Sequence, residues 1–222
     1  MPRNNSLNLQ YQLTESDLKE AGIKPYPLEE FRPVSYVPGW FVSNFARIVS
    51  KRSNQVKELH TVWKKGRETI ATYQCENGEK KSVAYDLHKL VADAFVPIPD
   101  WIKPGDTVQI HHIREVNKEE RDISTHYASN LMRLPVSIHN TIHSIAQIEV
   151  YAAKRFQSMD FISAAEKLDI TPYELDDIIR NQPHVKDGVY TVYNYPILHG
   201  KKVNNLIFRL IYNKDLRKIL QN

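Results

Sequence analysis

The spacing of apolar residues switches along the chain between the two-residue period of strands and the three- to four-residue period of helices. Two strand-like runs in residues 68–86 flank Asn77-Gly78, a dipeptide suited to the positive φ angles of a two-residue hairpin turn. After this hairpin the period becomes helical, at Leu87, Leu90, Val91 and Ala94. Asp86 is placed to cap that helix. The pattern therefore predicts a β-hairpin that leads directly into a helix.

The chain before this hairpin predicts a short helix and then small strands. Residues 14–30 begin like a helix capped by Thr14 or Ser16, and Gly22 and Pro25 end the run. Residues 31–55 are rich in aromatic and β-branched side chains and are broken by Pro38-Gly39. That composition indicates short strands and turns, with a small core made by Trp40, Phe41, Phe45 and Ile48.

The middle of the chain predicts a strand and a second helix. Residues 107–113 alternate between apolar and polar side chains, which is typical of a strand. From Ser137, a suitable N-cap, the period is helical, with a stripe of Ile138, Ile142, Ile145 and Ala146. His139 and His143 are four residues apart, so they lie one above the other beside this stripe.

The C-terminal part predicts a separate helical module. Residues 161–182 contain two helical patterns with a turn around residues 169–171, where Thr171 caps the second helix and Pro172 takes its first position. Residues 201–222 combine basic and apolar side chains. Together with the strands upstream, this favours an α+β fold.

Composition limits the chemistry that these elements can carry. The net charge of +4 makes a polyanionic partner reasonable but does not identify one. The single cysteine, Cys75, excludes a disulfide framework and a Cys-rich zinc site. The first ten residues lack the apolar run of a secretory signal, and no stretch is apolar for long enough to span a bilayer. We therefore expect a soluble, cytoplasmic protein with no membrane partner.

Histidines are concentrated between Gln109 and Ser144, which hold five of the nine in the chain. A pair four residues apart on a helix presents two nitrogens that one divalent ion can bridge, and a strand histidine would complete a three-ligand site. His111 and His112 are neighbours on a strand, so their side chains point to opposite faces. We infer divided labour, in which one binds the metal and the other accepts a proton from water.

These residues resemble the motif of the HNH, or ββα-metal, nucleases. The family places a histidine pair on a strand, Asn-Leu after a loop, and a helical histidine further on; here those are His111-His112, Asn130-Leu131 and His139, followed by His143. Three flanking stretches are also similar to phage and intron homing endonucleases. Residues 86–100 are similar to their helix before the motif, residues 40–50 to a modular DNA-binding element, and residues 161–179 to appended helix-turn-helix modules.

The resemblance implies a metal-dependent, site-preferring endonuclease of the homing type, which hydrolyses phosphodiester bonds of double-stranded DNA and leaves 5′-phosphate and 3′-hydroxyl ends. A phage-encoded enzyme of this kind would act in the host cell. The resemblance also implies a division of the chain. Residues 1–30 would form a helical or extended segment, residues 31–66 a β-rich DNA-binding element, residues 67–150 the ββα-metal core, and residues 151–222 a helix-turn-helix-like module with a basic tail. No small-molecule cofactor is expected.

The family's roles carry over to matched positions. His112 would be the general base, and Asn130 would hold the loop or orient that base. His111, His139 and His143 would hold one divalent ion, Mg²⁺, Mn²⁺, Zn²⁺ or Ni²⁺; imidazole ligands favour the transition metals and zinc, while the identity of the ion stays open. The expected DNA contacts are Ser43, Asn44, Arg47, Lys51, Arg52 and Arg114.

Departures from the family leave alternatives open. Ala46 stands where the modular element has glycine, so a left-handed backbone is not expected there. For His88, as for His60, His184 and His199, an ordinary structural role is expected. For His126, a structural role and a role in the site both stay open.

Two alternative functions also stay open. One is a DNA-binding accessory protein whose metal-stabilised scaffold has lost catalysis, and the other is a toxin-like non-specific nuclease. Because one active centre cuts one strand, double-strand cleavage needs a homodimer or a second binding event.

Overall fold

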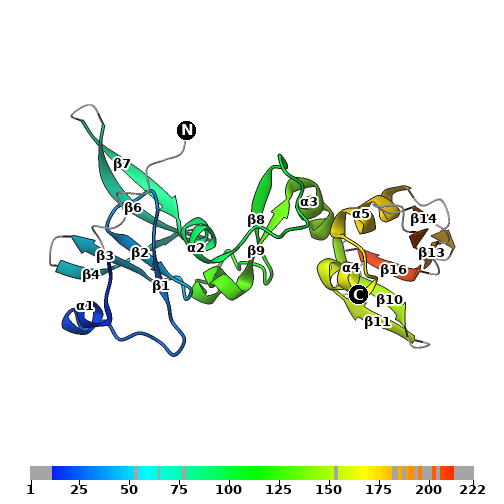
Figure 1. Cartoon of the computed structure of the whole chain (residues 1–222), viewed down its shortest axis with the longest axis horizontal. Helices are drawn as coiled ribbons and strands as arrows, with labels where there is room; N and C mark the ends of the chain where they lie inside the picture. The colour runs from blue at the N-terminus through cyan, green and yellow to red at the C-terminus, as the bar shows by residue number, and fades with distance from the viewer. Residues whose placement is uncertain are drawn as a thin grey trace. The chain divides into compact units, whose positions relative to one another are not determined.

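The computed structural model describes residues 12–52, 55–64, 66–76, 79–152, 155–181, 185–186, 189–192, 195–196, 202–203 and 206–212. These residues form several small antiparallel sheets and a few helices (Figure 1), which confirms the expected mixture of α and β structure at this coarse level. The chain divides into two compact units, Met1–Pro99 with Ile110–Arg133, and Asp100–Gln109 with Leu134–Asn222. The four segments expected from the sequence divide the chain by function, whereas these two units divide it by compactness, so the units do not test the four segments.

The first unit contains a four-stranded and a three-stranded antiparallel sheet. The first has the order β1-β2-β3-β4, and the second has the order β5-β6-β7. The bounds are α1 (Glu15–Glu20), β1 (Phe31–Pro33), β2 (Trp40–Ser43), β3 (Ile48–Arg52), β4 (Gln55–Leu59), β5 (Val62–Lys64), β6 (Arg67–Glu76), β7 (Glu79–Asp86) and α2 (Leu87–Phe95). The short strands expected after residue 30 are therefore present.

The predicted hairpin and helix are confirmed. Glu76 of β6 pairs with Glu79 of β7, so two residues connect the strands; those two, Asn77-Gly78, lie outside the described residues. Asp86 takes the N-cap position of α2 but makes no side-chain cap hydrogen bond, and its carboxylate pairs with Lys89 instead. The apolar stripe of α2 packs with Trp40, Ile48 and Leu131 into one core, which holds the helix against both sheets and the later loop.

Ala46 corrects one expectation. Its φ angle is 59°, so the backbone is left-handed although alanine replaces glycine. Ser43 holds this turn, because its hydroxyl accepts hydrogen bonds from the Phe45 and Arg47 N–H groups at 3.2 and 3.1 Å. Ala46 also donates its own N–H to the Ser43 carbonyl at 3.0 Å. The surrounding hydrogen bonds therefore impose a conformation that the alanine side chain disfavours.

A run of short elements carries the histidines. It consists of β8 (Val108–His112), the 3₁₀ turns η2 (Ile123–His126) and η3 (Ala128–Asn130), β9 (Leu131–Pro135) and α3 (Val136–Ser144). β8 and β9 form a two-stranded sheet, and α3 begins immediately after β9. Pro135, rather than the expected Ser137, takes the N-cap position of α3. The strand predicted at residues 107–113 is confirmed.

The second unit contains the two helices expected of a helix-turn-helix-like module, and also strands that the sequence did not predict. Helices α4 (Phe161–Lys167) and α5 (Pro172–Asn181) lie where expected, and Thr171 caps α5 through its hydroxyl and the Glu174 N–H at 3.3 Å. They accompany a five-stranded antiparallel sheet with the order β11-β10-β16-β13-β12. The strands are β10 (Ile145–Ala152), β11 (Arg155–Met159), β12 (Val185–Lys186), β13 (Val189–Val192) and β16 (Leu206–Tyr212), with a separate pair β14 (Tyr195–Pro196) and β15 (Lys202–Val203).

The strand β10 replaces the last turn of a predicted helix. Ile145 was expected on the helical stripe with Ile138, but α3 ends at Ser144 and Ile145 begins β10. Ile148 and Val150 are fully or almost fully buried in the sheet, where β10 pairs with both β11 and β16. Burial between two partner strands therefore outweighs the local helical period. In the described part of the chain, no helix is both long and apolar enough to cross a membrane.

Candidate metal and catalytic site

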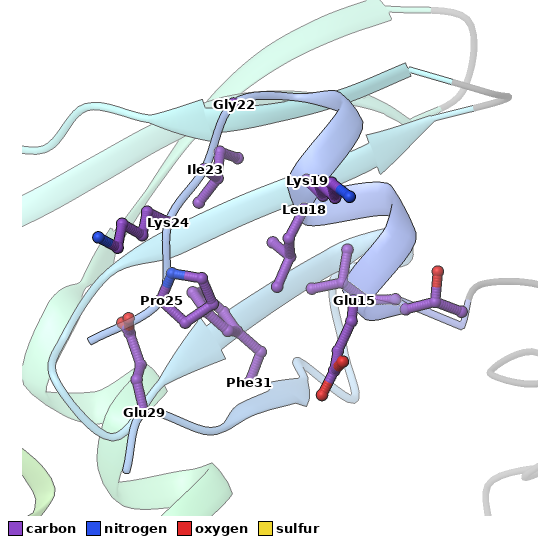
Figure 2. Close-up of a pocket in the computed structure, with 11 residues that line it drawn as sticks. Glu15, Leu18, Lys19, Gly22, Ile23, Lys24, Pro25, Glu29 and Phe31 are labelled. Atoms are coloured by element: carbon purple, nitrogen blue, oxygen red, sulfur yellow. The ribbon is translucent and has the colours of Figure 1, made fainter. Parts of the chain in front are cut away.

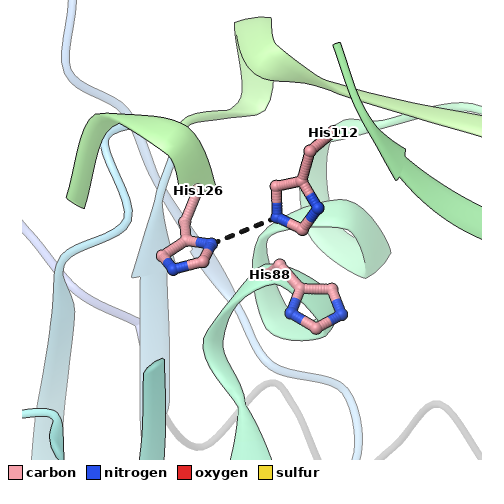
Figure 3. A group of neighbouring side chains, drawn as sticks. All are labelled: His88, His112 and His126. Carbon is pink, nitrogen blue, oxygen red and sulfur yellow. Dashed lines mark hydrogen bonds between the residues drawn. The ribbon is translucent and has the colours of Figure 1, made fainter. Parts of the chain in front are cut away.

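Three histidines from separate elements of the first unit face one another (Figure 3). His88 lies in the first turn of α2, His112 ends β8, and His126 ends η2. His112 Nε2 and His126 Nδ1 are 3.2 Å apart, and one ligand nitrogen of each ring lies within 4.8 Å of the others. The His88 ring stacks on His126 with centroids 6.1 Å apart and tilts against His112 at 5.2 Å. We call these three side chains the inner histidine cluster.

Burial keeps the inner histidine cluster neutral. Desolvation is the main cause that lowers the pKa of His88 and of His112 to about 4, and the neighbouring imidazoles lower both further. Desolvation also lowers the pKa of His126. Near pH 7 each ring therefore has one N–H and one lone pair. A lone pair on a neutral imidazole can accept a proton or bind a metal ion.

A buried carboxylate acts on this cluster. The Glu68 side chain is fully buried and accepts hydrogen bonds from Thr61 and from Arg121 Nε at 3.1 Å. Its negative charge raises the pKa of His126, against the larger effect of burial. The ion pair with Arg121 keeps a charge stable at a position where an unpaired carboxylate would be strongly disfavoured.

Asn130 holds the loop that follows β8. Its amide oxygen accepts the Arg114 N–H at 2.8 Å, and its amide nitrogen donates to the carbonyls of Arg114 and Thr125 at 3.1 and 2.8 Å. Its backbone carbonyl accepts the Ile113 N–H at 2.9 Å. These bonds tie Asn130 to both sides of the loop. The side-chain bonds of Asn130 within the described residues do not reach His112.

A second pair of histidines lies on α3 in the second unit. His139 Nε2 and His143 Nε2 are 3.2 Å apart, as expected for side chains on successive turns of a helix. Desolvation, and then the His143 ring, lowers the pKa of His139. Two nitrogens bound to one tetrahedral Zn²⁺ stand about 3.3 Å apart, given Zn–N distances near 2.0–2.1 Å. The α3 pair therefore fits one ion. His111 belongs to the first unit, where it is buried on β8.

Of the six expected DNA contacts, four are engaged in bonds within the protein and two are exposed. Ser43 is buried in its turn, and the Asn44 amide bonds to Glu30 N–H and Leu28 carbonyl. Arg47 pairs with Glu58 and Glu29, both at 2.8 Å; its hydrogen bonds with Glu58 raise its pKa and lower that of Glu58.

Lys51 is similarly occupied, by Asp17 and by the Gln12 carbonyl, both at 2.7 Å. Arg52 and Arg114 are exposed, although Arg114 also contacts Asp122 at 3.1 Å. A phosphate can reach these two without first breaking a buried ion pair.

A cavity of about 630 Å³ lies elsewhere in the first unit (Figure 2). Its wall combines apolar side chains from α1 and β1 with charged ones, and the described lining residues are Leu13, Thr14, Glu15, Leu18, Lys19, Gly22, Ile23, Lys24, Pro25, Glu29 and Phe31. These include no histidine. The candidate site is therefore assigned to the histidines, whose neutral rings can accept a proton or bind a metal ion.

The sequence did not identify His88 and His126 as site residues. The sequence offers only one partial signal, that His126 lies in the same loop as Asn130. No spacing rule joins residues 88, 112 and 126, because α2, β8 and η2 are brought together by the shared core that holds Leu90 and Ile123.

Comparison with protein-family models and with curated proteins finds no match. Among solved structures, the chain is similar to one described as "DNA binding and cleavage by the HNH homing endonuclease I-HmuI". The identity is 18%, the TM-score is 0.34, and the match covers 82% of this chain and 98% of that one. At this identity and TM-score, the likeness establishes neither a shared fold nor a shared activity.

Proposed function

We propose that this chain is a metal-dependent DNA endonuclease of the HNH type, which hydrolyses a phosphodiester bond to 5′-phosphate and 3′-hydroxyl ends. The observation that carries the proposal is the half-buried His112 at the end of β8, which lies 3.2 Å from His126 and beside the loop that Asn130 holds. β8, β9 and α3 also follow one another in the order of a ββα unit, and the helix carries the His139 and His143 pair.

His112 acts as the general base in this proposal. The proposal takes the tautomer in which His112 Nε2–H donates to His126 Nδ1 across the 3.2 Å contact, which leaves the lone pair of His112 on Nδ1. Nδ1 then takes a proton from water, and the resulting hydroxide attacks the phosphorus. His126 orients the ring, and Asn130 fixes the loop from which His126 projects.

His139 and His143 hold the metal ion, and His111 of β8 is proposed as the third ligand. The 3.2 Å separation of the two α3 nitrogens fits one ion, and three protein ligands leave positions open for substrate. When bound, the ion supplies a Lewis acid at the scissile phosphate and stabilises the departing 3′ oxygen. Imidazole ligands, unlike carboxylates, add no negative charge that would repel DNA.

Double-stranded DNA is the proposed substrate. Arg52 and Arg114 are proposed as phosphate contacts because their guanidinium groups are exposed. Ser43, Asn44, Arg47 and Lys51 hold the β1–β3 region together instead, through the bonds described above. Removal of Arg47 would therefore disturb the fold before it disturbed DNA binding.

Conversion of supercoiled plasmid tests the proposal. Wild type, His112→Ala and His139→Ala are each incubated with EDTA, Mg²⁺, Mn²⁺, Zn²⁺ or Ni²⁺. We expect metal-dependent nicking by the wild type and its loss in both variants. His60→Ala is the matched control, because His60 is exposed and belongs to neither histidine group.

If His112→Ala cuts at the wild-type rate, His112 is not the base. A folded, metal-loaded wild type that binds DNA and never cuts it would favour the accessory-protein alternative. Metal would then raise the melting temperature through binding alone.

A further inference from the structure

The inner histidine cluster has the geometry of a metal site in its own right. The 3.2 Å between His112 Nε2 and His126 Nδ1 is close to the separation of about 3.3 Å between two nitrogens on one tetrahedral Zn²⁺. His88 supplies a third nitrogen within 4.8 Å of the other two. The three rings come from α2, β8 and η2, and their packing around one core positions them before any ion binds.

We propose that His88, His112 and His126 form a separate, inhibitory site for a divalent transition-metal ion such as Zn²⁺. The inference that the three rings bind an ion rests on their geometry alone. The inhibition rests on the proposed function, because it requires His112 to be the base.

The chemistry of the cluster favours a borderline ion over Mg²⁺. All three ligands are imidazole nitrogens, which suit Zn²⁺, Cu²⁺ and Ni²⁺, whereas Mg²⁺ prefers oxygen. The carboxylates of Glu68, Asp122 and Asp86 favour positive charge at the cluster, and Arg121, Lys89 and Arg67 oppose it.

Binding at this cluster would disable the base through its tautomer. A neutral imidazole has one N–H and one lone pair. If the ion takes the lone pair of His112 at Nε2, the proton of that ring must move to Nδ1. Nδ1 then has no lone pair to accept a proton from water. An ion held by this cluster therefore blocks hydrolysis without occupying the site of the catalytic ion.

Cobalt titration tests the binding. The full chain is stripped with EDTA, dialysed, and titrated with Co²⁺ while the visible d–d absorption of four-coordinate cobalt is recorded. We expect the wild type to bind one ion at the inner histidine cluster and one at the α3 pair. His88→Gln should weaken only the first by more than about tenfold, since losing even an outer-shell partner of a metal costs that much.

Two variants make the titration decisive. A double His139→Gln, His143→Gln variant should lose only the α3 ion, and His60→Gln should match the wild type. If His88→Gln does not fold, as judged by circular dichroism, His126→Gln replaces it. Equal cobalt stoichiometry and affinity in folded wild type and His88→Gln would overturn the site.

A second arm tests inhibition. Cleavage supported by Mn²⁺ is measured while Zn²⁺ is added, and each rate is divided by that of the same variant without Zn²⁺. We expect His88→Gln to need more than about tenfold more Zn²⁺ for half inhibition than the wild type needs. Equal inhibition of both proteins would overturn the inhibitory role. A wild type that binds cobalt at the cluster but never cuts DNA would overturn the proposed function and leave the metal site standing.

Discussion

At the residue scale, Asn130 joins the end of β8 to the following loop through both ends of one amide. Asn130→Asp keeps an acceptor for the Arg114 N–H, but it loses both donated bonds and places a carboxylate against two carbonyl oxygens. We expect the free energy of unfolding to fall by about 1–3 kcal/mol, measured in urea. Asn117→Asp is the control, because the Asn117 amide oxygen accepts a bond that a carboxylate also accepts. Equal stability of the two variants would contradict this role for Asn130.

A second prediction at this scale concerns the contribution of the Glu68 charge to stability. Its fully buried carboxylate is held by Arg121 and Thr61, and Glu68→Gln keeps its shape but removes the charge. We expect a loss of roughly 1.5 kcal/mol, at the low end for a charged hydrogen bond, because Arg121 is half exposed to solvent. Glu30→Gln should change stability by less than about 0.5 kcal/mol, since the Glu30 side chain is 67% exposed. Thermal melts of both variants check the difference.

At the element scale, α1 depends on one carboxylate. Asp17 closes a capping box with Thr14 and pairs with Lys51 of β3 at 2.7 Å. The hydrogen bond from Lys51, followed by those from Thr14, lowers the pKa of Asp17 from 3.8 to about 2. A pKa that is lower in the folded state means that Asp17 stabilises the fold fully above pH 3.8. That stability is lost as the pH falls towards 2.

Asp17→Asn tests this dependence on pH. We expect the variant to be less stable than the wild type at pH 6, and the difference to shrink as the pH falls from 3.8 towards 2. Urea midpoints across that range give the difference, and hydrogen exchange in residues 15–23 locates it on α1. A difference that stays constant with pH would show that the charge of Asp17 does not stabilise α1.

Elements with local signals were predictable from the sequence, and those fixed by distant partners were not. The hairpin, α2 and α5 are each set by a turn dipeptide, a cap or an apolar period within a few residues. β10 is different, because the helical period before it runs past its start, and one of its two partners, β16, lies about sixty residues further along the chain. The same reason hides His88 and His126, whose meeting with His112 depends on how α2, β8 and η2 pack.

At the scale of the whole molecule, the net charge of +4 does not tell which basic residues can meet DNA, because some of them already pair with acidic residues of the same chain. Arg47 and Lys51 lie in ion pairs with acidic residues, whereas Arg52 and Arg114 are exposed. Each phosphate contact releases counterions, so the logarithm of DNA affinity should fall linearly with the logarithm of salt concentration.

Arg52→Gln and Arg114→Gln should therefore each weaken binding to every DNA sequence and reduce that slope by about one. Fluorescence anisotropy in EDTA measures binding without cleavage. Arg47→Gln is the informative contrast: it removes the same charge, yet it should leave the slope unchanged and lower the melting temperature, because its partners are Glu58 and Glu29. If Arg47→Gln reduced the slope while Arg52→Gln and Arg114→Gln did not, DNA would have to displace the buried ion pairs. The β1–β3 region would then rearrange on binding.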